Sequence, residues 1–153
     1  MQIEKRLEEL GLTLPKPAVP MANYVEAVRT ENLLFLSGHG PGAGGGKLSS
    51  GRLGEDLSVE EGYDSAKRVA LSLVSTLKDT LGDLDRVKRV VKLTGFVNSA
   101  PGFLEQSKVI NGASDFFVEL FGEKGHHTRS AVGMAALPTG IPVEIELIAE
   151  IGD

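Results

Sequence analysis

Hydrophobic side chains occupy every second position near the end of the chain, and this pattern constrains the fold more than any other feature. One side of the pattern holds Val143, Ile145, Leu147 and Ala149. The other side holds Glu144, Glu146, Ile148 and Glu150. A period of two sustained over these residues predicts a β-strand with one buried face. The chain is therefore expected to build a sheet that packs on one side against the rest of the protein.

A second apolar segment, from Arg129 to Leu137, comes just before this strand. Its small and branched side chains are typical of a strand that is covered on both faces. The sequence Leu137-Pro138-Thr139-Gly140 separates the two segments and suits a turn, because proline fixes φ and glycine accepts a positive φ. We therefore predict a final β-hairpin, with Arg129 at the start of its first strand and Glu144 near the start of its second.

Arg129 and Glu144 are the candidate catalytic residues, and the pattern leaves two roles open for each. An arginine in an apolar strand is costly to bury unless a negative group meets it. That group is either Glu144 or Glu146 in a structural ion pair, or the carboxylate of a ligand, which a guanidinium binds with two parallel hydrogen bonds. Glu144 in turn either positions and deprotonates a water molecule or is a solvated residue on the polar face of its strand.

The rest of the chain alternates between strands and helices. The expected elements are, in order, a helix over 2–10, an extended proline-rich arm to residue 20, strands over 24–28 and 33–37, a helix over 58–82, a strand over 86–97 and a helix over 99–122. The long helix opens with a capping box at Ser58 and Glu61. The second one is expected to start at Ser99-Ala100-Pro101 and to end at Gly122.

This order of elements predicts an α+β fold with one mixed sheet and two long helices packed on one of its faces. Residues 1–20 form a short helix and an arm, and residues 21–153 a single domain. Two layers leave the second face of the sheet uncovered. We therefore expect that face to pack against other copies of the chain in a closed cyclic assembly.

Composition excludes several kinds of chemistry. The chain has no cysteine, so disulfides, thiolate catalysis and cysteine-based zinc sites are absent. A net charge of -5 has the wrong sign for a general nucleic-acid binder. The first residues are too charged for a signal peptide, and no apolar run approaches the roughly 20 residues of a membrane span, so a cytoplasmic location is expected.

Histidines and glycines offer weaker signals. His126 and His127 are adjacent and would point to opposite faces of a strand, so no metal site is expected, although one of them could line a pocket or act as a general acid. His39 is expected on the surface. The glycine-rich run from Gly38 to Lys47 misses the spacing of a phosphate-binding loop, which would need glycine at 41 and serine or threonine at 48, so we expect a mobile surface loop.

Taken together, these residues resemble the RidA/YjgF family of small trimeric enamine and imine deaminases, also known as endoribonuclease L-PSP proteins. The resemblance extends from about Tyr24 to Ala149. The motifs that carry it are Arg129-Ser130 with Val132, Leu137-Pro138, Val143-Glu144-Ile145-Glu146, Ile148-Ala149, Tyr24-Val25, Ser37-Gly38, and Asn111 five residues before Phe116-Phe117. It implies a chorismate-mutase-like α+β fold and a homotrimer whose interior is formed by three sheets.

The resemblance also implies roles for individual residues. Arg129 would bind the carboxylate of the substrate at a subunit interface, and Glu144 would position the water. The remaining substrate-binding residues would be Tyr24, Ser37, Asn111, Ala131 and His127. The substrates would be 2-enamine and 2-imine acids of the 2-iminobutanoate and 2-iminopropanoate type, hydrolysed to 2-keto acids and ammonia without a cofactor.

Two positions depart from the family pattern. Ala131 stands where the family usually has a cysteine, and His127 where it often has a proline, which places the chain in a divergent branch. Two alternatives to a deaminase stay open: a non-catalytic protein that holds a small carboxylate metabolite at the same interface, and an endoribonuclease, against which the acidic charge speaks.

Overall fold

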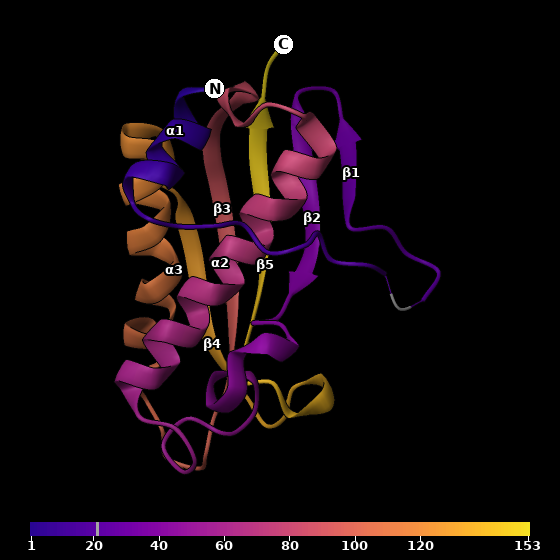
Figure 1. Cartoon of the computed structure of the whole chain (residues 1–153). Helices are drawn as coiled ribbons and strands as arrows, with labels where there is room; N and C mark the ends of the chain where they lie inside the picture. The colour runs from indigo at the N-terminus through magenta and orange to yellow at the C-terminus, as the bar shows by residue number, and fades with distance from the viewer. Residues whose placement is uncertain (21) are drawn as a thin grey trace.

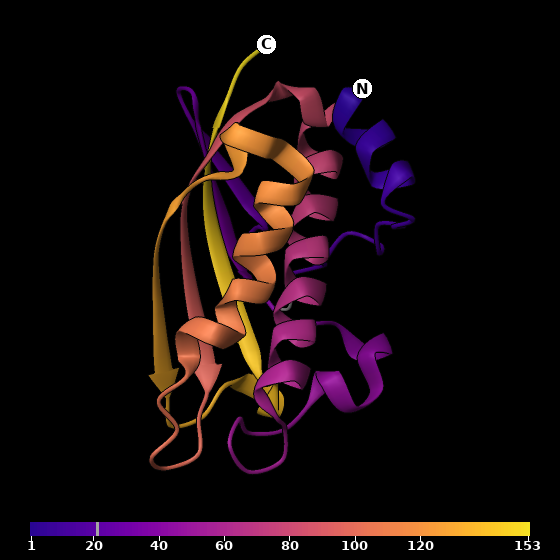
Figure 2. The ribbon, with the colours of Figure 1, turned by 90° about the vertical axis from the view of Figure 1, so that its left-hand side faces the viewer.

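The computed structural model describes residues 1–20 and 22–153 and shows two layers, a sheet and a pair of long helices (Figure 1). Seen along the sheet, α2 (Val59–Leu81) and α3 (Gln106–Phe121) both lie on the same face, and the opposite face is uncovered (Figure 2). The predicted α+β fold is thereby confirmed. The expected start of the domain at residue 21 lies outside the described residues.

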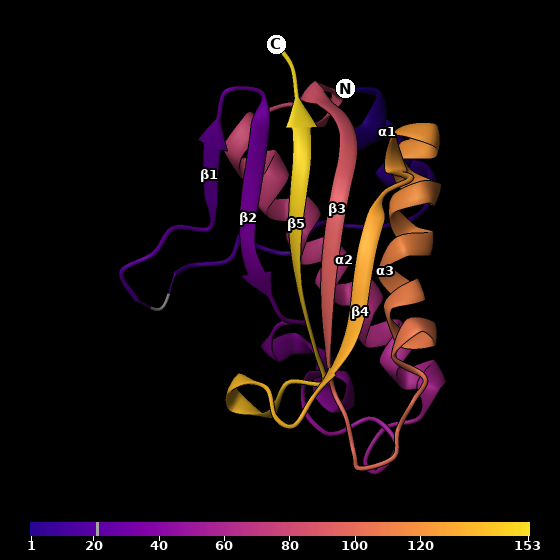
Figure 3. The same cartoon turned by 180° about the vertical axis from the view of Figure 1, so that it is seen from behind.

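The described part of the chain forms a five-stranded mixed sheet in the order β1-β2-β5-β3-β4 (Figure 3). The strands are β1 (Ala27–Thr30), β2 (Leu33–His39), β3 (Val87–Asn98), β4 (Thr128–Met134) and β5 (Val143–Ile151). The pair β3–β4 is parallel, whereas β1–β2, β2–β5 and β3–β5 are antiparallel. The first hairpin is therefore confirmed, although β1 begins later than expected.

The alternating segment near the end of the chain becomes β5, the central strand. Its buried residues face the two helices, and they are Val143, Ile145, Leu147, Ala149 and Ile151. Glu144 and Glu146 point to the uncovered face. The predicted alternation is confirmed, and it decides which face of the sheet joins the core.

The predicted final hairpin is wrong, because β4 and β5 are not neighbours. Both pair with β3, which lies between them. β3, α3 and β4 form a strand–helix–strand unit, and a helical crossover joins parallel strands. The segment Leu137–Gly140 is therefore part of a connection that carries the chain past the end of β3 to the far side (Figure 3). β4 is consequently an edge strand, with Val132 and Met134 exposed rather than covered on both faces.

The helix boundaries follow the sequence signals in most places. α2 begins with the capping box of Ser58 and Glu61 and ends at Gly82. α1 (Gln2–Glu9) buries Leu7 in the same core as the main helices. α3, however, begins at Gln106 and not at Ser99, because Gly102 has a φ of 83°, which an α-helix cannot contain.

Four short 3₁₀ segments complete the described part of the chain: η1 (Ala43–Ser49), η2 (Leu84–Arg86), η3 (Gly122–Gly125) and η4 (Pro138–Gly140). The glycine-rich run thus contains an ordered turn, and the Ser65 hydroxyl donates a hydrogen bond of 2.7 Å to the Leu48 carbonyl, which attaches η1 to α2. Among the described residues, no helix has the length and apolar character needed to cross a membrane.

The two long helices approach each other closely at Gly112. A Cβ atom at this position would lie 2.0 Å from the carbonyl oxygen of Tyr63 on α2, so any side chain would push the two backbones apart. Gly62 on α2 is a matched contrast. A Cβ atom there would meet side-chain atoms, the closest being Cδ1 of Leu53 at 2.5 Å, and these can move.

We predict that Gly112→Ala lowers the free energy of unfolding by about 2–3 kcal/mol, because backbone atoms cannot make room without separating the helices. Gly62→Ala should cost clearly less. Urea denaturation of both variants and of the wild type measures the two losses. An equal or smaller loss for Gly112→Ala would contradict the proposed backbone contact.

Candidate functional site

Arg129 lies on β4 with its side chain on the face of the sheet that the helices cover. It pairs in register with the buried Leu93, and its Nη1 donates a hydrogen bond of 3.1 Å to the hydroxyl of Ser114 on α3. Its Nη2 donates to the Ser107 carbonyl oxygen at 3.3 Å. Both acceptors are neutral, so the guanidinium charge has hydrogen-bond partners but no counter-charge from these groups.

Neither glutamate of β5 pairs with Arg129. Glu144 and Glu146 lie on the uncovered face, opposite Phe96 and Thr94 of β3, and the sheet itself separates them from the guanidinium. In the described part of the chain, no carboxylate forms an ion pair with Arg129. The structure therefore removes the structural ion pair that the sequence left open.

Arg129 opens into a cavity of about 580 Å³ between α3 and the start of β4. Asn111 and His127 line the same cavity, so three predicted binding residues, from α3, from β4 and from the segment before β4, come together. We call Asn111, Ser114, His127 and Arg129 the Arg129 cluster.

A chain of hydrogen bonds runs through this cluster, and each group donates to the next, from Arg129 to the Gly125 carbonyl. The Ser114 hydroxyl accepts from Arg129 and donates to Nε2 of His127 at 2.8 Å, while Nδ1–H of His127 donates to the Gly125 carbonyl at 2.6 Å. Burial, and then the charges of Arg129 and His126, lower the pKa of His127 against the opposing effect of the Gly125 carbonyl. His127 is therefore neutral near pH 7 and acts as an acceptor for Ser114.

Glu144 belongs to a second group of residues, and its side chain lies on the opposite face of the sheet from that of Arg129. A Cβ atom on Gly38 would lie 2.8 Å from Oε2 of Glu144, so the glycine leaves room for the carboxylate. Ser37 donates its hydroxyl to the Val25 carbonyl, and Tyr24 lines a cavity together with Gly38. We call Tyr24, Ser37, Gly38 and Glu144 the Glu144 cluster.

Burial, and then the negative charge of Glu146, raise the pKa of the Glu144 carboxyl, whereas His39 lowers it. The net direction is upward. A carboxyl whose pKa is raised accepts a proton more readily, which suits a group that takes a proton from water and returns it.

The two clusters cannot act together within one chain. Arg129 pairs with Leu93 and Leu93 with Leu147, so Arg129 and Glu144 are two strands apart and three residues apart along the strands. These offsets correspond to about 10 Å in each direction. The two side chains also emerge from opposite faces of the sheet, so a small molecule could touch both only if a second copy supplied one of them.

Ala131 and His126, the other candidates near Arg129, do not take part in the hydrogen bonds of the Arg129 cluster. Ala131 lies on β4 on the same face as Arg129 and packs against the core, outside the residues that line the cavity. His126 is exposed beside His127 and accepts a hydrogen bond from Arg89 through its carbonyl. Ser114 carried no signal in the sequence, since a lone serine in a helix is common.

The prediction that His39 lies on the surface is wrong: the side chain is 1% exposed. The pairing of β2 with β5 shifts between Leu36 and His39, so His39 takes the inward position opposite Ile145. Nδ1–H of His39 donates to the Ser37 carbonyl at 2.6 Å. Its Nε2 lies 2.8 Å from Oγ1 of Thr76 and 3.3 Å from Oε2 of Glu26. A bulge of this kind has no signature in a single sequence.

One acidic group in the described residues, Glu4, Asp83 and Asp85, has the spacing of a cation site. Most of its oxygens are already engaged: Asp85 accepts from the backbone N–H groups of Gln2 and Ile3, and Oε1 of Glu4 accepts from Lys78 and the backbone N–H of Leu84, whereas Oε2 of Glu4 has no hydrogen-bond partner. These carboxylates anchor α1 and η2 to each other, which is a structural role.

Fold and site together define a small α+β protein with an arginine beside a cavity at one edge of its sheet. The family model described as "YjgF/chorismate_mutase-like, putative endoribonuclease" matches residues 4–151, and the chain belongs to this family. The match also includes most of α1, so it reaches further toward the N-terminus than the motifs that begin at Tyr24.

Individual relatives have the same fold over nearly the whole chain. Protein TCP17 of Trypanosoma cruzi is 47% identical over 153 residues, which cover 99% of this chain and 96% of that protein. The structure of Atu1372 from Agrobacterium tumefaciens, of unknown function, is 45% identical with a TM-score of 0.90, over 98% of this chain and 92% of its own. RidA from an Antarctic Psychrobacter species is 27% identical with a TM-score of 0.59, over 89% and 94% of the two chains.

Asp115 also lines the cavity of the Arg129 cluster, but it is bound elsewhere. It accepts a hydrogen bond of 2.8 Å from the hydroxyl of Tyr63 on α2. This hydrogen bond, followed by burial and the charge of Asp115, raises the pKa of Tyr63 to about 12. This carboxylate of the cavity wall thus bonds α2 to α3 and forms no ion pair with Arg129.

We predict that Asp115→Asn returns the pKa of Tyr63 toward the ordinary value of about 10, whereas the control Asp64→Asn leaves it almost unchanged. The chain has two tyrosines and no tryptophan, so a Tyr24→Phe background isolates the phenolate absorbance of Tyr63 in an alkaline titration. Folding raises this pKa, so the stability it contributes is present below the unfolded pKa and is lost as the pH rises through about 12. A titration unaffected by Asp115→Asn would contradict the assigned hydrogen bond.

Proposed function

We propose that the protein hydrolyses reactive 2-imino acids to 2-keto acids and ammonia, at a site shared by two copies of the chain. One observation carries the proposal: the predicted site residues form two separate clusters, each of which lacks what the other supplies. The Arg129 cluster offers an uncompensated positive charge beside a cavity. The Glu144 cluster offers a carboxylate with a raised pKa.

Arg129 binds the carboxylate of the substrate. Its Nη1 and Nη2 are already held by Ser114 and the Ser107 carbonyl, so the guanidinium plane is fixed before the ligand arrives. A fixed plane with parallel N–H groups matches a carboxylate better than a lysine ammonium does. Membership of a family that includes RidA supports this assignment.

Glu144 acts on the water. The carboxylate accepts a proton as the water oxygen bonds to the imine carbon, which gives a tetrahedral carbinolamine. The same proton passes to the imine nitrogen, which completes the neutral carbinolamine. Glu144 then carries the hydroxyl proton of the carbinolamine to the nitrogen in the same way. The C–N bond breaks as the C=O bond forms, and ammonia leaves with the 2-keto acid as the second product. Every atom comes from the imino acid and one water molecule, so the reaction needs no oxidant and no cofactor.

The surfaces of the chain support association through the sheet. Large apolar side chains are exposed on the uncovered face, and they are Val28, Phe35, Val132 and Met134. A patch of this kind marks an interaction surface in a soluble protein. A closed ring of three copies would cover this face and could bring β4 of one copy toward the Glu144 cluster of the next.

We predict that Arg129→Ala abolishes hydrolysis of freshly generated 2-iminobutanoate but changes the free energy of unfolding by only about 1 kcal/mol or less, because no buried carboxylate loses its partner. Arg129→Lys should also be inactive. Ammonia release and thermal denaturation are the two measurements. A strongly destabilised Arg129→Ala, together with an active Arg129→Lys, would contradict the carboxylate-binding role.

Mixed assemblies test whether the site is shared. Arg129→Ala and Glu144→Gln should each be inactive alone. Trimers containing both variants, co-expressed with two tags and purified through each tag in turn, should recover about a third of the wild-type activity, since one of the three interfaces then has both intact groups. If the mixed trimers stay inactive, the two groups do not meet between copies.

Two other functions, carboxylate binding without catalysis and RNA cleavage, would give results different from those of a deaminase. A wild-type protein that binds 2-oxobutanoate through Arg129 but releases no ammonia from the imine would be a carboxylate-binding protein. RNA cleavage that survives purification and is lost in His126→Ala would favour the endoribonuclease of the family description, despite a net charge of -5.

A further inference from the structure

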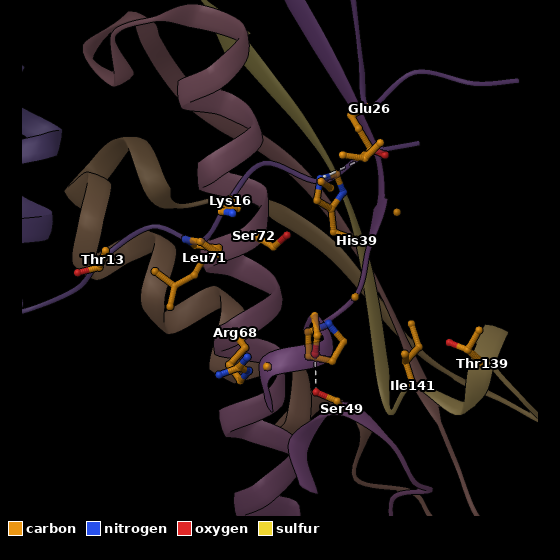
Figure 4. Close-up of a pocket in the computed structure, with 18 of the residues that line it drawn as sticks. Thr13, Lys16, Glu26, His39, Ser49, Arg68, Leu71, Ser72, Thr139 and Ile141 are labelled. Carbon is orange, nitrogen blue, oxygen red and sulfur yellow. Dashed lines mark hydrogen bonds and ion pairs between the residues drawn. The ribbon is translucent and has the colours of Figure 1, made fainter. Parts of the chain in front are cut away.

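A cavity larger than that of the Arg129 cluster lies elsewhere in the described structure. It has a volume of about 810 Å³ and lies beside α2, between the N-terminal arm and the glycine-rich segment (Figure 4). Volumes of this size are typical of small-molecule sites. The cavity touches the Glu144 cluster through Tyr24 and Gly38, but most of its wall consists of residues that the proposed reaction does not use.

Two hydrogen bonds to α2 hold the walls of this cavity in place. The Ser65 hydroxyl donates to the Leu48 carbonyl of η1, and the Ser75 hydroxyl donates to the Pro15 carbonyl of the arm. The two serines are ten residues apart on α2, or about 15 Å along the helix axis. Arg68, Leu71 and Ser72 lie between them and face the cavity (Figure 4).

The charges at the two ends of the cavity differ. At one end lies the carboxylate of Glu26, with its Oε2 3.3 Å from Nε2 of His39. At the other end, Arg68 forms no ion pair with any carboxylate of the described residues, and its buried Nε–H has no acceptor. Lys16 adds a second positive charge at the rim. The Arg68 end of the cavity therefore carries a positive charge that has no counter-charge among the described residues.

The glycine-rich segment explains how Arg68 is held. A Cβ atom on Gly45 would lie 2.8 Å from Nε of Arg68, and one on Gly44 would lie 3.8 Å from its Nη2. The absence of side chains at these positions lets the segment lie directly against the guanidinium. The remaining wall is largely apolar, with Pro15, Leu71 and Ile141 among its residues.

We propose that this cavity binds an elongated small molecule with one anionic head group, a carboxylate or a phosphate, on an apolar body. The head group lies at Arg68, where the positive charge has no partner. The body lies along Leu71 and the arm toward Tyr24. This site is separate from the carboxylate site at Arg129 and does not depend on the proposed deaminase activity.

The test uses three probes of equal chain length: octanoate, octyl phosphate and 1-octanol. Each is titrated into the ¹⁵N-labelled protein and followed by backbone amide shifts and by calorimetry. We expect the anions to bind more tightly than the alcohol, with shift changes at Gly44, Ser49, Leu71 and Ser72. The stronger of the two anions identifies the head group as a carboxylate or a phosphate.

Three variants locate the place where the anions bind. Arg68→Gln should weaken binding of the anions at least tenfold, while Lys67→Gln, the same charge change one residue away and outside the cavity, should leave it unchanged. Arg129→Gln should also bind normally. Thermal denaturation of each variant verifies folding. Equal binding by Arg68→Gln and wild type, loss of binding in Arg129→Gln, or shifts centred on Phe35 and Val132 would each overturn the proposal.

Discussion

The burial of one face of β5 is the constraint on which the rest of the structure depends. Val143, Ile145 and Leu147 join the core beneath the two helices, and this places Glu144 and Glu146 on the opposite face. Because side chains alternate along a strand, a residue on β5 cannot serve both faces. The positions of the strands on either side follow from this centre, and so does the division of the candidate site into two clusters.

The position of Arg129 shows how a charge can be kept available inside a folded chain. Its guanidinium receives geometric support from Ser114 and the Ser107 carbonyl, which are neutral. The nearby carboxylate of Asp115 is bound to Tyr63 instead. An ion pair with Asp115 would stabilise the free protein, but a ligand would then have to displace it. The hydrogen bonds orient the group without competing for the place of an anion.

Features that depend on local pattern could be predicted from the sequence. The alternation of β5, the cap of α2 at Ser58 and the end of α3 at Gly122 all appear in the structure where the sequence indicated. The pairing of β5 could not be predicted, because alternation defines a face and says nothing about the neighbouring strand. The start of α3 was misplaced since Pro101 suits a turn as well as a first helical turn.

The candidate site could likewise be predicted in part from the sequence. Arg129 was named from the strand pattern, and Asn111 and His127 as binding residues from the resemblance; the structure places all three around one cavity. Ser114, which links two of them, and the inward position of His39 were not predictable, since the first depends on the packing of α3 against β4 and the second on an irregular register. Long-range packing and bulges are properties of the folded chain that no short window of sequence contains.

The separation of Arg129 and Glu144 by the sheet has a consequence for the dependence of function on protein concentration. Any chemistry that needs both groups obeys mass action, since dilution that dissociates the copies removes the site without unfolding a single chain. Below the dissociation constant of the assembly, specific activity would then fall steeply with dilution. The amount of protein in its compartment would itself set a threshold for function.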